Sequence, residues 1–197
     1  MFVTNYEPPI KRRAFAEGGV ERRLTEPAVM LAFAFHLLEC ATEEALVTIH
    51  PDGEHAKIFE IAPFLAGCGF ERIENLGRTM YGGRYVRGKH ALIVNPTSGK
   101  GDVVGEVDGR RVIAECKGGV INSTHNGQRS RTRKGMSELV GQLMIRPQNG
   151  DRHVAVLPET YDTIRLTPLL AQRCAQVGIE IALVEENGQI RYVLPTA

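Results

Sequence analysis

Apolar and polar residues follow two kinds of spacing along this chain, one typical of helices and the other of strands. Longer segments with helical spacing or nearly continuous apolar character predict helices at 28–40, 54–66, 136–146 and 168–177. Short β-branched and apolar runs bounded by turn residues predict strands at 45–50, 70–73, 91–94, 153–157, 180–184 and 189–194. Helices and strands that alternate in this way predict an α/β domain built on a mixed sheet.

Capping and turn residues mark several boundaries of these elements. Thr25 is the expected N-cap of the first helix, with Pro27 in its first turn. Thr167 and Gly178 are expected to begin and end the last helix. Asn187-Gly188 predicts a tight turn between the last two strands.

Three segments carry no clear periodicity. Residues 75–90 contain four glycines among basic residues, which predicts a loop or an irregular hairpin, and residues 119–135 predict a polar connection. Residues 1–24 are polar and interrupted by proline and glycine pairs, so we expect an N-terminal arm without assigned structure. The remainder, 25–197, is expected to form a single domain.

The segment 101–118 carries the most specific signal. Two β-branched runs flank Asp108-Gly109, a pair that strongly favours a tight hairpin turn. A turn centred on that pair places Asp102 directly opposite Glu115, and the same pairing holds for a two- or a four-residue loop. In such a pair the Cβ atoms are about 4.5–5.5 Å apart on one face of the sheet.

Opposed like charges destabilise a sheet, so these two carboxylates call for a cation between them. Glu115 and Lys117 are two residues apart and share that face, whereas Cys116 points toward the core. Two carboxylates suit Mg²⁺, with Mn²⁺ as the other candidate, and the lysine can stabilise negative charge beside the metal. The segment therefore predicts a metal-assisted hydrolytic site.

The run Gly101-Asp102, followed thirteen residues later by Glu115-Cys116-Lys117, resembles the signature of the PD-(D/E)xK superfamily of nucleases. This resemblance covers residues 54 to about 157 and implies a restriction-endonuclease-like fold: a mixed β-sheet flanked by helices, with an αβββαβ core, an N-terminal helical extension and a C-terminal helix and hairpin. It implies that Asp102 and Glu115 are metal ligands and that Lys117 orients or activates the attacking water. Gly101 departs from the proline that often stands there in the family.

The resemblance also implies two auxiliary residues. An acidic residue on the first core helix often joins such a site, and helix 54–66 offers Glu60 or Glu54, of which Glu60 is taken as the metal ligand. Gln142, on the helix that follows the ExK strand, is the candidate auxiliary catalytic residue; a solvated helix face explains it equally well. His50 and His55 fit no helical zinc spacing and are interpreted as surface histidines.

Basic residues crowd the connection before the third helix. The candidate nucleic-acid-binding residues are Arg129, Arg131, Arg133 and Lys134. The net charge of the whole chain is only +1, from 24 basic and 23 acidic residues, so any surface that binds nucleic acid must be local.

The composition, with 43% hydrophobic and 24% charged residues, is that of a globular protein. The longest apolar stretch is shorter than the roughly 20 residues that cross a bilayer, and the N-terminus lacks a signal-peptide pattern, so we expect a cytoplasmic protein without a membrane partner. The expected function is Mg²⁺-dependent hydrolysis of DNA. The sequence does not determine the oligomeric state, and a homodimer is one possibility. The alternative is a catalytically silent nuclease-like subunit that binds nucleic acid or supports assembly; the opposed carboxylates favour the enzyme.

Overall fold

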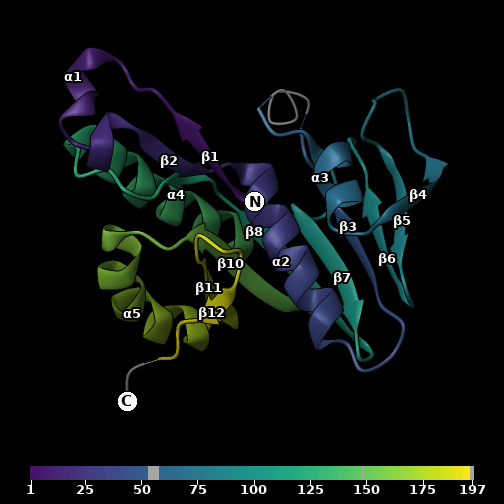
Figure 1. Ribbon diagram of the computed structural model, residues 1–197. Coiled ribbons are helices and arrows are strands. Elements are labelled where there is room, and N and C mark those ends of the chain that lie inside the picture. Colours follow the sequence, from purple (N-terminus) through teal and green to yellow (C-terminus); the bar gives the residue numbers. More distant parts are fainter. Residues whose placement is uncertain (53–57, 148, 196–197) are drawn as a thin grey trace.

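The computed structural model describes residues 1–52, 58–147 and 149–195 (Figure 1). Its helical elements are α1 (Ile10–Arg13), the short 3-10 helix η1 (Glu17–Gly19), α2 (Glu26–Cys40), α3 (Ile61–Gly67), α4 (Asn126–Met144) and α5 (Tyr161–Gln176). Its strands are β1 (Val3–Tyr6), β2 (Glu21–Leu24), β3 (Leu46–Ile49), β4 (Glu71–Asn75), β5 (Gly83–Arg87), β6 (His90–Val94), β7 (Val103–Val107), β8 (Arg110–Cys116), β9 (Gly119–Val120), β10 (Arg152–Pro158), β11 (Ile179–Val184) and β12 (Ile190–Tyr192).

One large mixed sheet organises the described residues, in the order β12-β11-β10-β8-β7-β3-β6-β5-β4. Strands β8, β10 and β11 run parallel to one another, and β3 runs parallel to β6. Strand β7 is antiparallel to both of its neighbours, β3 and β8. The predicted α/β class with a mixed sheet is confirmed.

Helices cover both faces of this sheet, and neighbouring residues of β10 separate the two layers. Val154 and Val156 belong to the core that contains α2, whose side chains are buried almost all round. Ala155 and Leu157 belong to a second core formed with α4 and α5. Because successive side chains of a strand point to opposite faces, α2 lies on one face, and α4 and α5 lie on the other (Figure 1).

The predicted helix 28–40 is confirmed, with Thr25 as N-cap accepting a hydrogen bond from the amide of Ala28. The predicted helix 136–146 is only the second half of α4, which begins at Asn126 after the cap residue His125. The apolar spacing missed this start because the first turns of α4 are polar. The basic residues expected in a connection therefore lie on a helix.

The last helix also begins earlier than predicted. Helix α5 starts after Thr160, whose side chain accepts from the amide of Thr163, while the Thr163 hydroxyl accepts from the amide of Thr160. Pro168, taken as its first residue, lies inside the helix, where the backbone loses one hydrogen bond. The reciprocal threonine cap, not the proline, marks the start.

The predicted helix 54–66 is shorter in the described residues. Helix α3 begins at Ile61, with Glu60 as its N-cap, and residues 53–57 lie outside the described part. Pro63 explains this start, because proline is tolerated in the first turn of a helix and not further in. Segment 75–90 contains β5, which pairs with β4 and β6, so the hairpin alternative is confirmed.

The N-terminal arm is folded onto the domain. Strands β1, β2 and β9 form a three-stranded antiparallel sheet beside α4 (Figure 1). Glu21 of β2 is fully buried there, in ion pairs with Arg12 at 3.3 Å and Arg23 at 2.8 Å and accepting from the Gln128 side chain at 3.3 Å. A buried carboxylate with three partners fixes this sheet to the start of α4.

Candidate active site

The hairpin register that the sequence predicts is the one observed. Val103 pairs with Ala114 and Val107 with Arg110, around a turn in which Asp108 and Gly109 have positive φ angles of 49° and 73°. One further step along this ladder places Asp102 opposite Glu115. The Oδ2 atom of Asp102 accepts a hydrogen bond of 2.7 Å from the amide of Cys116, which locks the aspartate to the end of β8.

Both carboxyl groups of this pair are raised in pKa. Burial is the main cause for Asp102, opposed by the Cys116 amide, and the charge of Glu26 raises its pKa further. Burial is also the main cause for Glu115, which is 4% exposed, and the charge of Asp102 raises its pKa further. The pair is therefore costly to ionise unless a cation accompanies it.

Lys117 lies directly beyond this pair at the end of β8. Its amide donates to the carbonyl of Val156 at 3.1 Å, which continues the ladder with β10. Its Nζ atom forms an ion pair of 3.5 Å with Oε2 of Glu26, and its methylene groups lie near Gly135 of α4. The ammonium thus stays at the sheet end, close to the carboxylates.

Glu26 is a candidate site residue that sequence reasoning missed. It occupies the first turn of α2, where an acidic side chain is favoured by the helix dipole, so local rules account for its presence without reference to a site. A backbone crossing brings it to Lys117: a Cβ atom on Gly118 would lie 2.5 Å from the amide nitrogen of Glu26. The feature that could have pointed to Glu26 is its position at the start of the helix that precedes β3, the strand paired with β7.

The acidic residues expected from helix 54–66 have other surroundings. Glu60 caps α3 and is exposed, and the structure places Glu26, not Glu60, in contact with Lys117. Glu54 lies outside the described residues. Gln142 is exposed on α4 and lies seven residues from Gly135, so it shares the side of the helix that meets Lys117.

Arg146 supplies a second cation at the pair. It follows α4 and donates a short hydrogen bond from Nη2 to Oε1 of Glu115. This contact lowers the pKa of Glu115 against the effects of burial and of Asp102. Part of the repulsion between the two carboxylates is therefore offset within the chain.

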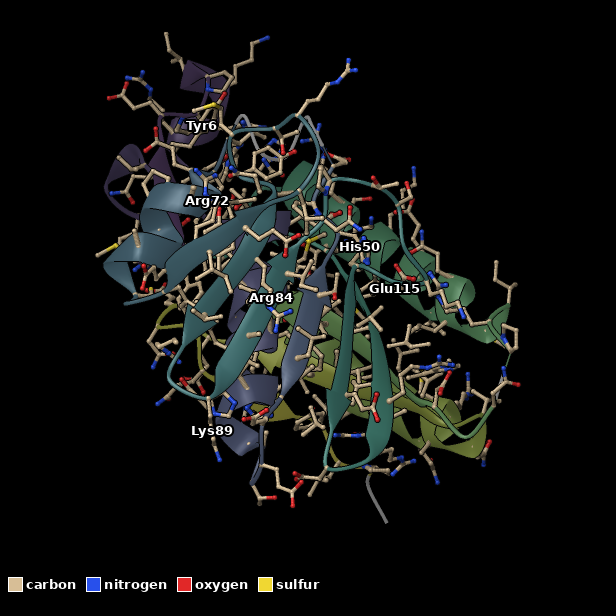
Figure 2. All side chains as sticks on the ribbon, turned by 90° about the vertical axis from the view of Figure 1, so that its right-hand side faces the viewer. Tyr6, His50, Arg72, Arg84, Lys89 and Glu115 are labelled. Atoms are coloured by element: carbon tan, nitrogen blue, oxygen red, sulfur yellow. The ribbon has the colours of Figure 1, made fainter. Side chains whose placement is uncertain are left out.

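His50 borders the pair on the side of β3. Ile49 pairs with Val103, so the next step of that ladder places His50 opposite Asp102, and the His50 amide donates to the Asp102 carbonyl at 2.8 Å. The Nδ1 atom of its ring lies 2.6 Å from the carbonyl of Thr97. Figure 2 shows His50 and Glu115 toward the same end of the sheet, and His50 is half-buried there. His55 lies outside the described residues.

The basic residues of α4 differ in whether their side chains are already paired with other residues of the protein. Arg129 makes two hydrogen bonds, of 3.0 and 2.9 Å, to Asp162, which is 2% exposed, so it joins α4 to α5, and its role in nucleic-acid binding stays a prediction. Lys134 pairs with Glu138 at 3.7 Å on an exposed face, and the Arg133 side chain donates to the Arg129 carbonyl. Arg131 is exposed beside Lys117 and has no ion pair among the described residues.

Asp102 and Glu115 offer hard oxygen ligands at one sheet end, which fits Mg²⁺, an ion that uses one or two carboxylates and keeps several waters. Burial is the main cause of their raised pKa values, and a cation between the two carboxylates would favour their ionised forms. Within the described residues, no group of three or more His, Cys, Asp or Glu side chains is preassembled as a metal site.

Comparisons with known proteins found no similar protein. No protein-family model, no curated protein and no solved structure matches this chain. No helix among the described residues is long and apolar enough to cross a membrane.

Proposed function

We propose that this protein is a metal-dependent nuclease that hydrolyses phosphodiester bonds in DNA. The observation that carries the proposal is the buried pair Asp102–Glu115, opposed in the register of β7 and β8, with Lys117 at the same sheet end. Two opposed carboxylates with raised pKa values destabilise the folded protein when both are ionised. A cation bound between them would offset this repulsion, which supports a metal-binding role for the pair.

The topology supports a restriction-endonuclease-like fold. Helix α2 leads into β3, the strands β3, β7 and β8 are neighbours in the sheet, and α4 leads from β8 into the parallel strand β10. This is an αβββαβ order in which the first helix is α2 and not 54–66. The elements α3 to β6 form an insertion between the first and second core strands.

The residues can share the chemistry as follows. Asp102 and Glu115 would hold Mg²⁺ or Mn²⁺, which acts as a Lewis acid and lowers the pKa of a bound water. Lys117 would orient the attacking water and stabilise negative charge that develops on the phosphate. Glu26 holds the Lys117 ammonium at 3.5 Å, which limits its motion.

Nucleic acid is the proposed substrate because Arg131 and Lys134 line the same cavity as Lys117. Arg131, Arg133 and Lys134 project from the start of α4, and Arg131 lies near Lys117. Cations of this kind bind phosphates without reading sequence.

The four cysteines are all free thiols, which supports a reducing compartment such as the cytoplasm.

One observation favours the alternative of a silent nuclease-like subunit. Arg146 already supplies a positive charge to Glu115, as expected of a site in which arginine has replaced a metal. Lys117 and the second carboxylate favour the enzyme, because a single arginine does not neutralise both acids.

A cleavage assay with matched variants decides between these two functions. Purified protein is incubated with single-stranded, duplex, flapped and branched DNA in Mg²⁺, Mn²⁺ or EDTA. We expect metal-dependent cleavage that Asp102→Asn and Lys117→Ala abolish and that Glu106→Gln retains, since Glu106 is an exposed residue of the same hairpin. Cleavage undiminished by Asp102→Asn would refute the site, and DNA binding without cleavage by the wild type would support the silent subunit.

A further inference from the structure

Two adjoining cavities lie beside Lys117, between the N-terminal sheet and α4. The larger, about 290 Å³, is bounded by β2, β9, the start of α2 and α4. The smaller, about 220 Å³, is bounded by Lys117, α4 and the end of β10. Both are lined by Gly118, Gly119, Arg131 and Thr132, so these residues form the border between the two spaces.

Arg131 is the cation that remains available at this border. On the same helix, Arg129 is engaged by Asp162, and Lys134 is paired with Glu138. Among the described residues Arg131 has no ion pair or hydrogen bond of this kind, although it lines both cavities. A planar guanidinium in this position suits a phosphate group, which it can bind through two hydrogen bonds.

The larger cavity has the lining of a site for a small organic molecule. Leu24, Pro27, Ile58 and Val120 provide apolar walls, and Thr132 contributes a polar edge. Its volume lies just below the range of about 300–1,000 Å³ for small-molecule sites. Glu26 lines the same cavity, so its interior opens beside the ion pair that holds Lys117.

We infer that this larger cavity is a subsite for one unpaired nucleotide of the DNA strand, next to the bond that is cut. The phosphate of that nucleotide binds Arg131 at the border, and its sugar and base lie against the apolar walls. The inference rests on the proposed nuclease function and names its substrate class: DNA with an unpaired nucleotide at the cleavage site, such as a single strand, a flap or a frayed end. A base that is still paired is held in the duplex stack, so it must leave its pair to reach the apolar walls of this partly open cavity.

The same lining predicts weak discrimination between bases. Gln128 is the amide side chain on the cavity wall, and its Nε2 group donates to the buried carboxylate of Glu21 at 3.3 Å. One of the two N–H groups of this amide is therefore committed to the N-terminal sheet. Recognition by apolar contact and one phosphate is tolerant of base identity.

Binding of thymidine 5′-monophosphate tests the subsite without cleavage. Calorimetry in EDTA compares this nucleotide with thymidine and with inorganic phosphate. We expect the nucleotide to bind more tightly than either fragment, and Arg131→Gln to weaken its binding about tenfold or more. Arg173→Gln, which removes an exposed arginine of α5, serves as the matched control and should change nothing.

A second variant separates the cavity from its cation. Thr132→Met places a larger side chain in the larger cavity while Arg131 stays in place, so nucleotide binding should be lost and phosphate binding retained. Equal affinities for the nucleotide and inorganic phosphate would overturn the inference, as would equal losses in the Arg131 and Arg173 variants. Thermal unfolding checks that each variant is folded.

The outcomes also separate this inference from the proposed function. A protein that cleaves DNA but binds no thymidine 5′-monophosphate is a nuclease without this subsite. A protein that binds the nucleotide through Arg131 but cleaves nothing has the cavity site and not the nuclease function. In an active enzyme we expect faster cleavage of single-stranded than of fully paired DNA, and equal rates would refute the unpaired substrate.

Discussion

The N-terminal segment and the chain after β8 approach each other closely at Gly118, so Gly118→Ala tests how the site is assembled. A Cβ atom there would lie 2.5 Å from the Glu26 nitrogen, 2.7 Å from the Leu24 oxygen and 2.8 Å from the Thr25 carbonyl carbon. All three are backbone atoms, so no side-chain rotation relieves the overlap. The two backbones must separate by several tenths of an ångström.

That separation should cost both stability and activity. Overpacking of this kind costs about 1–3 kcal/mol, and for a domain of this size each kcal/mol lowers the Tm by about 2–4 °C. The separation also moves Glu26 away from Lys117, which lies at 3.5 Å. A displacement near 1 Å at a catalytic group can cost about a hundredfold in rate.

Gly135→Ala is the matched control, because it adds the same methyl group on the other side of Lys117. Its nearest neighbours, Cγ and Cβ of Lys117, would be at 3.6 and 3.7 Å, which is ordinary contact. In a helix, alanine in place of glycine stabilises by up to about 1 kcal/mol. Urea unfolding gives the stabilities, and cleavage is measured well below the Tm of each variant. Wild-type stability and activity in Gly118→Ala would refute the backbone crossing as the device that positions Glu26.

Three further changes test the charges around the pair. Burial raises the pKa of Asp102, so the metal-free protein should lose stability as the pH rises above the ordinary carboxyl range. The Asp102→Asn variant should lose less stability than the wild type between pH 4.5 and 7.5 in EDTA, and Mg²⁺ should stabilise the variant less than the wild type. Arg146→Gln leaves Glu115 without its cation, so we expect a loss of about 1–3 kcal/mol that Mg²⁺ restores; identical Mg²⁺-induced shifts in variant and wild type would contradict this role. Arg129→Gln removes the partner of Asp162 and should lower the Tm without changing the salt dependence of DNA binding; the reverse result would return Arg129 to the DNA interface.

The parts of the site that were predictable from the sequence are local in the chain. The Asp108-Gly109 turn sets the register of β7 and β8 within a dozen residues, and the observed pairing of Val103 with Ala114 follows from it. The place of Lys117, two residues beyond Glu115, follows from strand geometry alone. Turn chemistry and side-chain alternation are therefore sufficient for these three positions.

Helix boundaries were less predictable, because a polar helical turn has no regularly spaced apolar residues from which a helix can be predicted. The first turns of α4 are held by Gln128, which binds buried Glu21 of β2, and by Arg129, which binds Asp162 of α5. Both partners are remote in sequence, so tertiary contacts rather than local spacing extend this helix. The same contacts give Arg129 a structural role that the sequence did not predict.

Glu26 could not have been found by local spacing, because its approach to Lys117 depends on two chain segments that cross. The strand paired with β7 is β3, and the helix before β3 is α2, so the N-terminus of α2 lies at the end of the sheet where Asp102 and Glu115 meet. Knowledge of the strand order would have directed attention to this helix. The sequence alone favoured the predicted helix 54–66, with Glu54 and Glu60.

The charges gathered by this topology explain why a divalent cation would change what the site can bind. Three carboxylates, Glu26, Asp102 and Glu115, face two cations, Lys117 and Arg146. With every group ionised the local balance is negative by one charge, so a phosphodiester is repelled; protonation of the Asp102–Glu115 pair removes that charge at the expense of its ligand oxygens. A doubly charged ion held by the pair makes the balance positive by one, which attracts a phosphate to the end of β8 and stabilises further negative charge upon it. The arrangement of acids and cations therefore links metal binding to cleavage, because the scissile phosphodiester is favoured at the Asp102–Glu115 pair only after the metal is in place, whereas a phosphate on Arg131 needs no metal.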